Sequence, residues 1–98
     1  MAPDQERTLT RELLAKLSEI EASLEPSEAK LIQPATIDDL ECPGGITVQG
    51  FDGRQIDERL RSMCRQGLIS SGTAPYDGAA VGVFFSHLTP AGRNFLGR

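Results

Sequence analysis

The chain is poor in the residues that build metal centres. It contains two cysteines, Cys42 and Cys64, which lie 22 positions apart, and a single histidine, His87. A structural zinc site needs about four suitably spaced ligands, and the sequence has no Cys-x-x-Cys pair. We therefore expect no metal ion, and we interpret Cys64 as a small hydrophobic residue at the edge of a buried helix face. A disulfide between the two cysteines is the alternative interpretation.

Long hydrophobic runs are also absent from the sequence. No apolar run approaches the roughly 20 residues that a membrane-spanning helix requires. The first six residues include two acidic and no basic side chains, and they lack the basic-then-apolar order of a secretory signal. We expect a cytoplasmic protein with no membrane partner. A length of 98 residues with 39% hydrophobic and 24% charged residues predicts one globular domain over 1–98, of which 1–7 are expected to be flexible.

Signatures of catalysis are missing as well. A serine nucleophile needs a base within hydrogen-bond reach, and His87 lies in a predicted strand with no catalytic motif around it. The segment Gly50-Phe51-Asp52-Gly53 lacks the Gly-Lys-Ser/Thr ending of a phosphate-binding loop. We therefore expect no catalytic residue, no enzymatic activity and no cofactor.

Positive charge is concentrated in the second half of the chain, although the whole chain has a net charge of −4. Residues 1–49 carry four basic against ten acidic side chains, which gives −6. Residues 50–98 carry six arginines against four acidic side chains, which gives +2. An acidic chain binds nucleic acid poorly, but a locally positive half can still present a basic face. Nucleic acid is therefore kept as a candidate partner.

An amphipathic helix is predicted from about Thr8 to Leu24. Its hydrophobic residues recur every three or four positions and so share one face: Leu9, Leu13, Leu17, Ile20 and Leu24. Glu25-Pro26 ends the helix, because the residue before a proline is pushed out of helical geometry. We interpret the leucine stripe as part of the core. The alternative is that it forms the seam of a homodimer.

The segment 26–45 is expected to be an irregular connection, because prolines and glycines interrupt it repeatedly. Within it, Ser27 or Thr36 could cap a single helical turn. The alternation in Ile46-Thr47-Val48-Gln49 then predicts a short, half-buried strand.

The most clearly delimited element is a helix over residues 52–66. Asp52 suits the N-cap and Gln55 the N3 position of a capping box. Gly67 suits the left-handed residue after the helix, with Leu68 able to pack back on the last turn. This helix contains four of the ten basic residues.

A β-hairpin is predicted directly after this helix. Residues 68–71 form its first strand, 81–88 the antiparallel partner, and 72–80 a turn-rich connection. Thr89 as N-cap with Pro90 at the first helical position opens a short C-terminal helix. The order helix, short strand, helix, β-hairpin wing and short helix predicts an α+β fold, a small winged-helix-like domain. The predicted core contains Leu13, Leu17, Ile20, Ile56, Leu60, Met63, Leu68, Val83, Phe85 and Phe95.

These features resemble those of a known family. The chain has Ile46-Thr47-Val48, then Gly50-Phe51, an amphipathic helix, Gly67-Leu68-Ile69, and a closing Leu88-Thr89-Pro90-Ala91-Gly92-Arg93-Asn94-Phe95-Leu96. In this it resembles the phage- and prophage-associated proteins called domain of unknown function 2513. The resemblance covers residues 46–96 and, in type only, the leading helix. It implies a winged-helix-like fold and no established activity.

The chain also departs from that family. The family tends to have a histidine where this chain has Arg59, and tryptophan and histidine where it has Pro90 and Arg93. Roles that those side chains play in relatives are therefore not carried over.

Three arginines of the 52–66 helix form the candidate nucleic-acid-binding site. At about 100° per residue, Arg54, Arg61 and Arg65 fall within about 40° of one another, roughly opposite the apolar positions. Guanidinium groups along an exposed helix face can contact DNA phosphates or guanine edges. Asp57 and Glu58 precede Arg61 by four and three positions and can pair with it. This pairing favours the alternative that the face is only solvated.

The tip of the hairpin carries a different candidate site. Residues 72–80 contain no lysine or arginine, whereas a wing that grips DNA usually brings a basic group. Pro75 and Tyr76 are therefore candidate partner-binding residues for a protein, with an ordinary packed loop as the alternative. Two hypotheses follow. The leading one is a small non-enzymatic regulatory protein that binds double-stranded DNA through the 52–66 helix. The other is a protein–protein interaction module on a winged-helix scaffold without nucleic-acid binding.

Overall fold

The computed structural model describes residues 3–25, 28–37, 40–41, 45–70 and 82–97. Their helices and strands follow one another as α1 (Pro3–Ser23), β1 (Lys30–Ile32), β2 (Thr36–Ile37), β3 (Leu40–Glu41), α2 (Gly53–Arg65), β4 (Ile69–Ser70), β5 (Val83–Phe85), β6 (His87–Leu88) and α3 (Pro90–Leu96). The predicted α+β class is confirmed. The succession of α2, a β4–β6 pair and α3 is compatible with a winged-helix-like arrangement.

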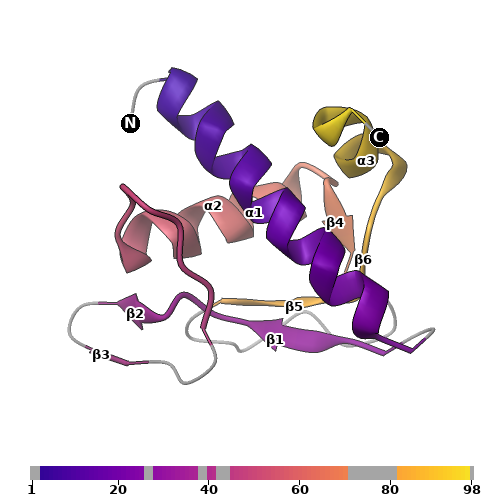
Figure 1. Ribbon diagram of the computed structural model, residues 1–98, viewed down its shortest axis with the longest axis horizontal. Helices are drawn as coiled ribbons and strands as arrows, with labels where there is room; N and C mark the ends of the chain where they lie inside the picture. Colours follow the sequence, from indigo (N-terminus) through magenta and orange to yellow (C-terminus); the bar gives the residue numbers. More distant parts are fainter. Residues whose placement is uncertain (1–2, 26–27, 38–39, 42–44, 71–81, 98) are drawn as a thin grey trace.

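Helix α1 is the centre of the packing. It contacts α2, α3 and β6, and in Figure 1 it runs diagonally across the molecule. The β1–β5 pair lies on the side of the molecule away from α3 (Figure 1). The helices and this strand pair therefore enclose the core between them.

Helix α1 begins at Pro3, so residues 3–7, expected to be flexible, form its first turns. Proline is tolerated at the start of a helix, where its missing N–H would have no helical partner. The four leucines Leu9, Leu13, Leu14 and Leu17 are 0% exposed within the single chain. The interpretation of the stripe as core is confirmed.

Both ends of α2 form as the sequence predicts. The N–H of Gln55 donates to Oδ1 of Asp52 at 2.8 Å, and the N–H of Asp52 donates to Oε1 of Gln55 at 2.9 Å, which completes the capping box. At the other end Gly67 has a φ of 76°, in the left-handed region. The N–H of Leu68 donates to the carbonyl of Met63 at 2.9 Å, as in a Schellman motif.

Strand β1 corrects the expectation that 26–45 is an irregular connection. Residues 30–32 pair antiparallel with β5, with Leu31 opposite Phe84 and Ile32 opposite Val83. The prolines of the segment lie outside this strand, so they interrupt it less than the sequence suggested. Gly82 makes the close approach possible: its φ is 84°, and a Cβ there would lie 2.1 Å from the carbonyl oxygen of Ile32.

The predicted strand 81–88 is divided at Ser86. Its first part, β5, pairs with β1, and its second part, β6, pairs with β4. The N–H of Ser86 still donates to the carbonyl of Ser70 at 2.6 Å, so the hairpin contact persists at the point of division. The strand changes partner because β1, far away in sequence, offers it a second edge.

The predicted strand 46–49 does not form. Ile46 makes only an isolated parallel bridge to Pro34. The chain turns immediately afterwards, since the N–H of Phe51 donates to the carbonyl of Val48 at 3.1 Å and Gly50 has a φ of 89°. Val48 is nonetheless buried, so the alternation correctly identified an inward-facing residue.

The core contains most of the residues that the sequence predicts. Seven predicted members are buried: Leu13, Leu17, Ile56, Leu60, Met63, Val83 and Phe85. Three pack against the core while remaining partly exposed: Ile20, Leu68 and Phe95. Leu9, a member of the stripe interpreted as core, is buried as well. The core also includes residues that were not predicted: Leu14, Ile32, Val48, Ile69 and Leu88.

Thr89 joins the end of α2 to the start of α3. Its hydroxyl accepts from the N–H of Gly92 at 3.2 Å and donates to the carbonyl of Gly67 at 2.5 Å. The predicted N-cap with Pro90 behind it is confirmed. A Cβ on Gly92 would lie 2.2 Å from the carbonyl oxygen of Leu68, so α3 can approach this junction only with glycine there.

Candidate functional site

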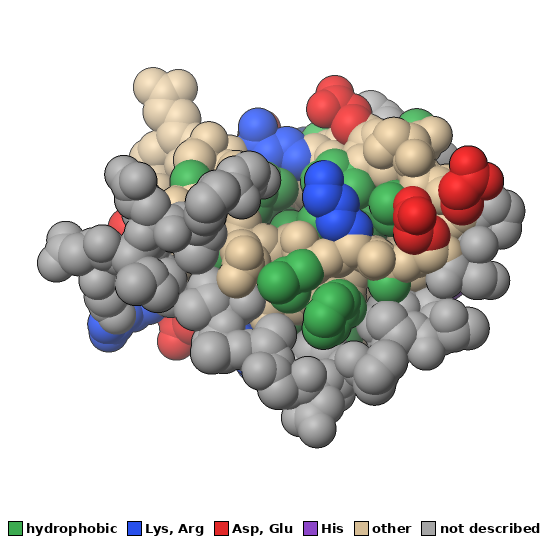
Figure 2. Space-filling view, turned by 90° about the horizontal axis from the view of Figure 1, so that it is seen from below, with side chains coloured by type: hydrophobic (Ala, Val, Ile, Leu, Met, Phe, Trp, Pro, Cys, Tyr) green, Lys and Arg blue, Asp and Glu red, His purple; other side chains and the backbone are tan. Residues whose placement is uncertain are grey.

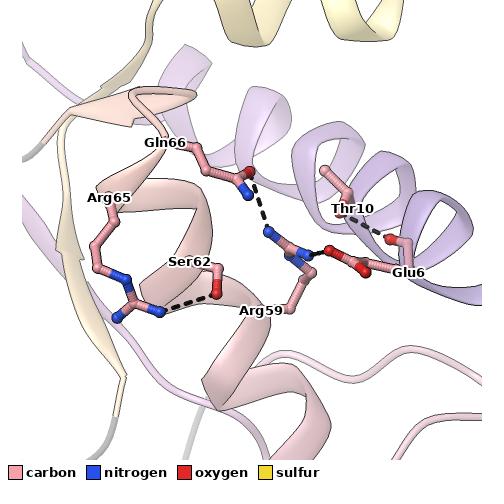
Figure 3. Close-up of polar contacts among 6 residues, drawn as sticks. All are labelled: Glu6, Thr10, Arg59, Ser62, Arg65 and Gln66. Carbon is pink, nitrogen blue, oxygen red and sulfur yellow. Dashed lines mark hydrogen bonds and ion pairs between the residues drawn. The ribbon is translucent and has the colours of Figure 1, made fainter. Parts of the chain in front are cut away.

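Helix α2 exposes two of the three predicted arginines at opposite ends of its outer side. Arg54 and Arg65 are exposed, whereas Ile56, Leu60 and Met63 on the other side are buried. Nη2 of Arg65 donates to Oγ of Ser62 at 3.0 Å (Figure 3). This side of α2, from Arg54 to Arg65, is called the outer face below.

Arg61 pairs with an acidic side chain of its own helix. Its Nε lies 3.2 Å from Oδ2 of Asp57, and the two side chains are 28% and 13% exposed. The Asp57 carboxylate also accepts from the N–H of Gly82 at 2.6 Å. The pairing expected from the spacing therefore forms.

Arg59 is the arginine of α2 that the sequence placed outside the site, and it is only 7% exposed. It forms an ion pair with Glu6 of α1 and donates from Nη2 to Oε1 of Gln66 at 3.1 Å (Figure 3). Its Nε is buried and has no hydrogen-bond partner among the described residues. A buried guanidinium is stable only beside a counter-charge, so Glu6 is part of the environment that Arg59 requires.

A shallow hollow of about 440 Å³ brings these groups together. It lies between α1 and α2 and is lined by Glu6, Gln55, Glu58, Arg59, Arg61, Ser62 and Arg65. Two of the predicted arginines, Arg61 and Arg65, reach it, whereas Arg54 does not line it. Sequence reasoning missed Glu6 and Arg59. The position of Arg59 beside the apolar face was a usable signal, but nothing in the sequence pointed to its partner 53 residues earlier.

A second surface feature lies on the β1–β5 pair. Leu31 is 38% exposed and lies directly across from the half-buried Phe84. The two point outwards because side chains alternate along a strand, and their neighbours Ile32 and Val83 point into the core. In Figure 2, which views the molecule from below, hydrophobic side chains lie together at the surface. The predicted partner-binding residues, Pro75 and Tyr76, lie outside the described residues.

The described residues contain neither a cluster of metal ligands nor a helix that could span a membrane. They contain no group of three or more histidine, cysteine, aspartate or glutamate side chains placed to hold a metal ion. None of the helices in this part of the chain combines the length and the apolar character needed to cross a bilayer.

Burial raises the pKa of the Cys64 thiol, while the positive charge of Arg65 opposes part of that rise.

Comparisons with protein-family models, with curated proteins and with solved structures found no match for this chain. The resemblance to domain of unknown function 2513 therefore stays a prediction. The structure defines the class as a small α+β domain with arginines on the outer face of one capped helix.

Proposed function

We propose that this protein is a small non-enzymatic regulator that binds double-stranded DNA through the outer face of α2, on a winged-helix-like scaffold. The observation that supports the proposal is the exposure of Arg54 and Arg65 on a helix whose opposite side is buried. Phosphate contacts supply much of the affinity for DNA, and arginine forms bidentate hydrogen bonds with phosphate.

The spacing of Arg54 and Arg65 suits the major groove of DNA. Arg54 and Arg65 are 11 residues apart, which corresponds to about 16 Å along a helix axis. A B-DNA major groove is about 12 Å wide, so guanidinium groups at the two ends of the helix can reach phosphates on opposite sides of it. Gln55 and Ser62, between them in sequence, are of the residue types that donate hydrogen bonds to bases or phosphates.

Two acidic groups limit the expected affinity. Glu58 is exposed and lines the same hollow as Arg65, and Asp57 already engages Arg61. Carboxylates near a DNA backbone are repelled by its phosphates, so the complex should be weak at physiological salt. We therefore expect binding that is clearest at low ionic strength.

The test is a titration of fluorescently labelled duplex DNA, followed by anisotropy at low and at physiological salt. An Arg54/Arg61/Arg65→Gln variant should lose roughly tenfold or more in affinity and show a shallower salt dependence, by about 0.9 for each phosphate contact removed. The matched control is Arg7/Arg11/Lys16→Gln, which removes the same charge from α1. Absence of binding by the unmodified protein at low salt contradicts the proposal, and so does an equal loss in both variants.

A second candidate function is a protein–protein interaction module without nucleic-acid binding. The observation in its favour is the cross-strand pair Leu31 and Phe84, an apolar contact surface on the outer side of β1–β5. The apolar stripe of α1 does not support this candidate, because Leu9, Leu13 and Leu17 are buried within the chain itself. A Leu31→Ser variant that leaves DNA binding intact but abolishes binding to a protein partner would favour it.

A further inference from the structure

We infer that the hollow between α1 and α2 is a binding site for a phosphate group, held by Arg59, Ser62 and Arg65, with Glu6 as the internal counter-ion that the phosphate replaces. The phosphate group comes either from the DNA backbone or from free phosphate. The inference rests on the proposed function only where the source is the DNA backbone. It assigns Arg59, which the sequence placed outside the site, to the binding machinery.

The donors lie on one side of α2. Arg59, Ser62 and Arg65 follow one another at steps of three residues, which places their side chains next to each other along the helix surface. All three line the same hollow, and Figure 3 shows Ser62 between the two arginines. Arg65 is already bonded to Ser62, so the guanidinium group is held over the hydroxyl. Two guanidinium groups and a hydroxyl are a donor set that suits phosphate oxygens.

The ion pair between Glu6 and Arg59 is asymmetric, and this makes exchange feasible. Glu6 is 48% exposed, so its carboxylate can turn into water, where solvation compensates for the lost ion pair. Arg59 is 7% exposed, so it cannot remain without an anionic partner. Its Nε has no bond among the described residues, so its donor capacity is not used up. An incoming phosphate therefore replaces Glu6, and Arg59 stays paired throughout.

The charge that lines the hollow favours an anion once Glu6 leaves. Three guanidinium groups, of Arg59, Arg61 and Arg65, face two carboxylates, of Glu6 and Glu58. Asp57 already pairs with Arg61, so turning Glu6 outwards leaves the guanidinium groups of Arg59 and Arg65 against the single carboxylate of Glu58. Glu6 thereby sets the affinity of the site: its negative charge competes with phosphate for the same guanidinium group.

The test follows the side-chain Nε–Hε resonances of Arg59 and Arg65 in ¹⁵N-labelled protein during a titration with sodium phosphate at constant ionic strength. Saturable shifts of both resonances are expected. Glu6→Gln keeps an oxygen for Arg59 but removes the competing charge, and it should tighten phosphate binding by roughly tenfold. Arg65→Gln, an exposed change that leaves the core intact, should weaken it by roughly tenfold. Arg11→Gln removes a charge elsewhere on α1 and should leave phosphate affinity unchanged.

Absence of saturable shifts in both the unmodified protein and Glu6→Gln would overturn the inference. Equal affinity in these two proteins would also overturn it, because Glu6 would then be a fixed structural partner. The same variants titrated with duplex DNA separate the carriers. Phosphate binding without duplex binding supports the phosphate site and contradicts the proposed function. Duplex binding that neither shifts the Arg59 resonance nor changes in Glu6→Gln supports the proposed function and overturns this inference.

Discussion

Asp57 accepts a hydrogen bond from the backbone N–H of Gly82 at 2.6 Å, although the two residues are 25 positions apart in the chain. The same carboxylate lies 3.2 Å from Nε of Arg61. One side chain therefore connects α2 to the residue immediately before β5 and also pairs with one candidate DNA-binding arginine. A residue that spacing alone assigns to a surface ion pair is thus part of the tertiary structure.

Replacing Asp57 by alanine should destabilise the fold. The N–H of Gly82 is buried and would lose its acceptor, so we expect the free energy of unfolding to fall by about 1–2 kcal/mol. Urea denaturation measures this loss. The control is Glu58→Ala at the neighbouring exposed position, where the change should stay within about 0.5 kcal/mol. Equal losses in the two variants would show that Asp57 acts only as a surface charge.

Gly92→Ala should weaken the junction between α2 and α3. The new Cβ would lie 2.2 Å from the carbonyl oxygen of Leu68, and a backbone atom cannot move aside without shifting the helix end. We expect a loss of about 1–3 kcal/mol, visible as a lower midpoint of thermal unfolding. Asn94→Ala on the exposed side of the same helix is the control and should change little. An unchanged melting temperature for Gly92→Ala would contradict the close approach of α3.

The leucine stripe of α1 leads to a prediction about oligomeric state. Because Leu17 is fully buried within one chain, Leu17→Ala should lower the free energy of unfolding by about 2–5 kcal/mol. The loss should not depend on protein concentration, since no subunit contact is removed. Thermal melts over a range of concentrations test this, with Glu19→Ala on the exposed side of the helix as control. A midpoint that rises with concentration would indicate a dimer seam instead.

The thiol of Cys64 should react slowly at neutral pH. Burial raises the pKa of this thiol, and the charge of Arg65 offsets only part of the effect. Because the thiolate is the reactive form, labelling of the folded protein should keep accelerating at pH values where an unfolded cysteine has already levelled off. Stopped-flow labelling of a Cys42→Ser variant, folded and in denaturant, compares the two profiles. Arg65→Gln should shift the folded profile further to alkaline pH. If the labelling rate of the folded protein levels off at or below the pH at which that of the unfolded protein does, the pKa of Cys64 is not raised by burial.

The sequence by itself determined the local structure. Asp52 with Gln55, Gly67, and Thr89 with Pro90 mark helix ends through bonds between residues at most a few positions apart, so their chemistry acts without the rest of the fold. Periodicity likewise identified which face of each helix is buried, because the 3.6-residue repeat places those side chains together in any globular context. The three arginines Arg54, Arg61 and Arg65 were placed on α2 for the same reason.

Only the tertiary structure decided which distant groups meet. Residues 30–32 form β1 within a segment whose prolines predicted a loop. The predicted strand 81–88 is divided at Ser86, because its first part pairs with β1 and its second part pairs with β4. The tertiary structure also buried Arg59 beside Glu6 and bound Asp57 to Gly82. The physical reason is that these contacts depend on the packing of α1 and β5 against α2, and a sequence pattern that repeats over a few residues contains no information about neighbours 25 or 53 positions away. The candidate site therefore combines a helix face that the sequence predicted with a counter-ion, Glu6, that only the tertiary structure places beside it.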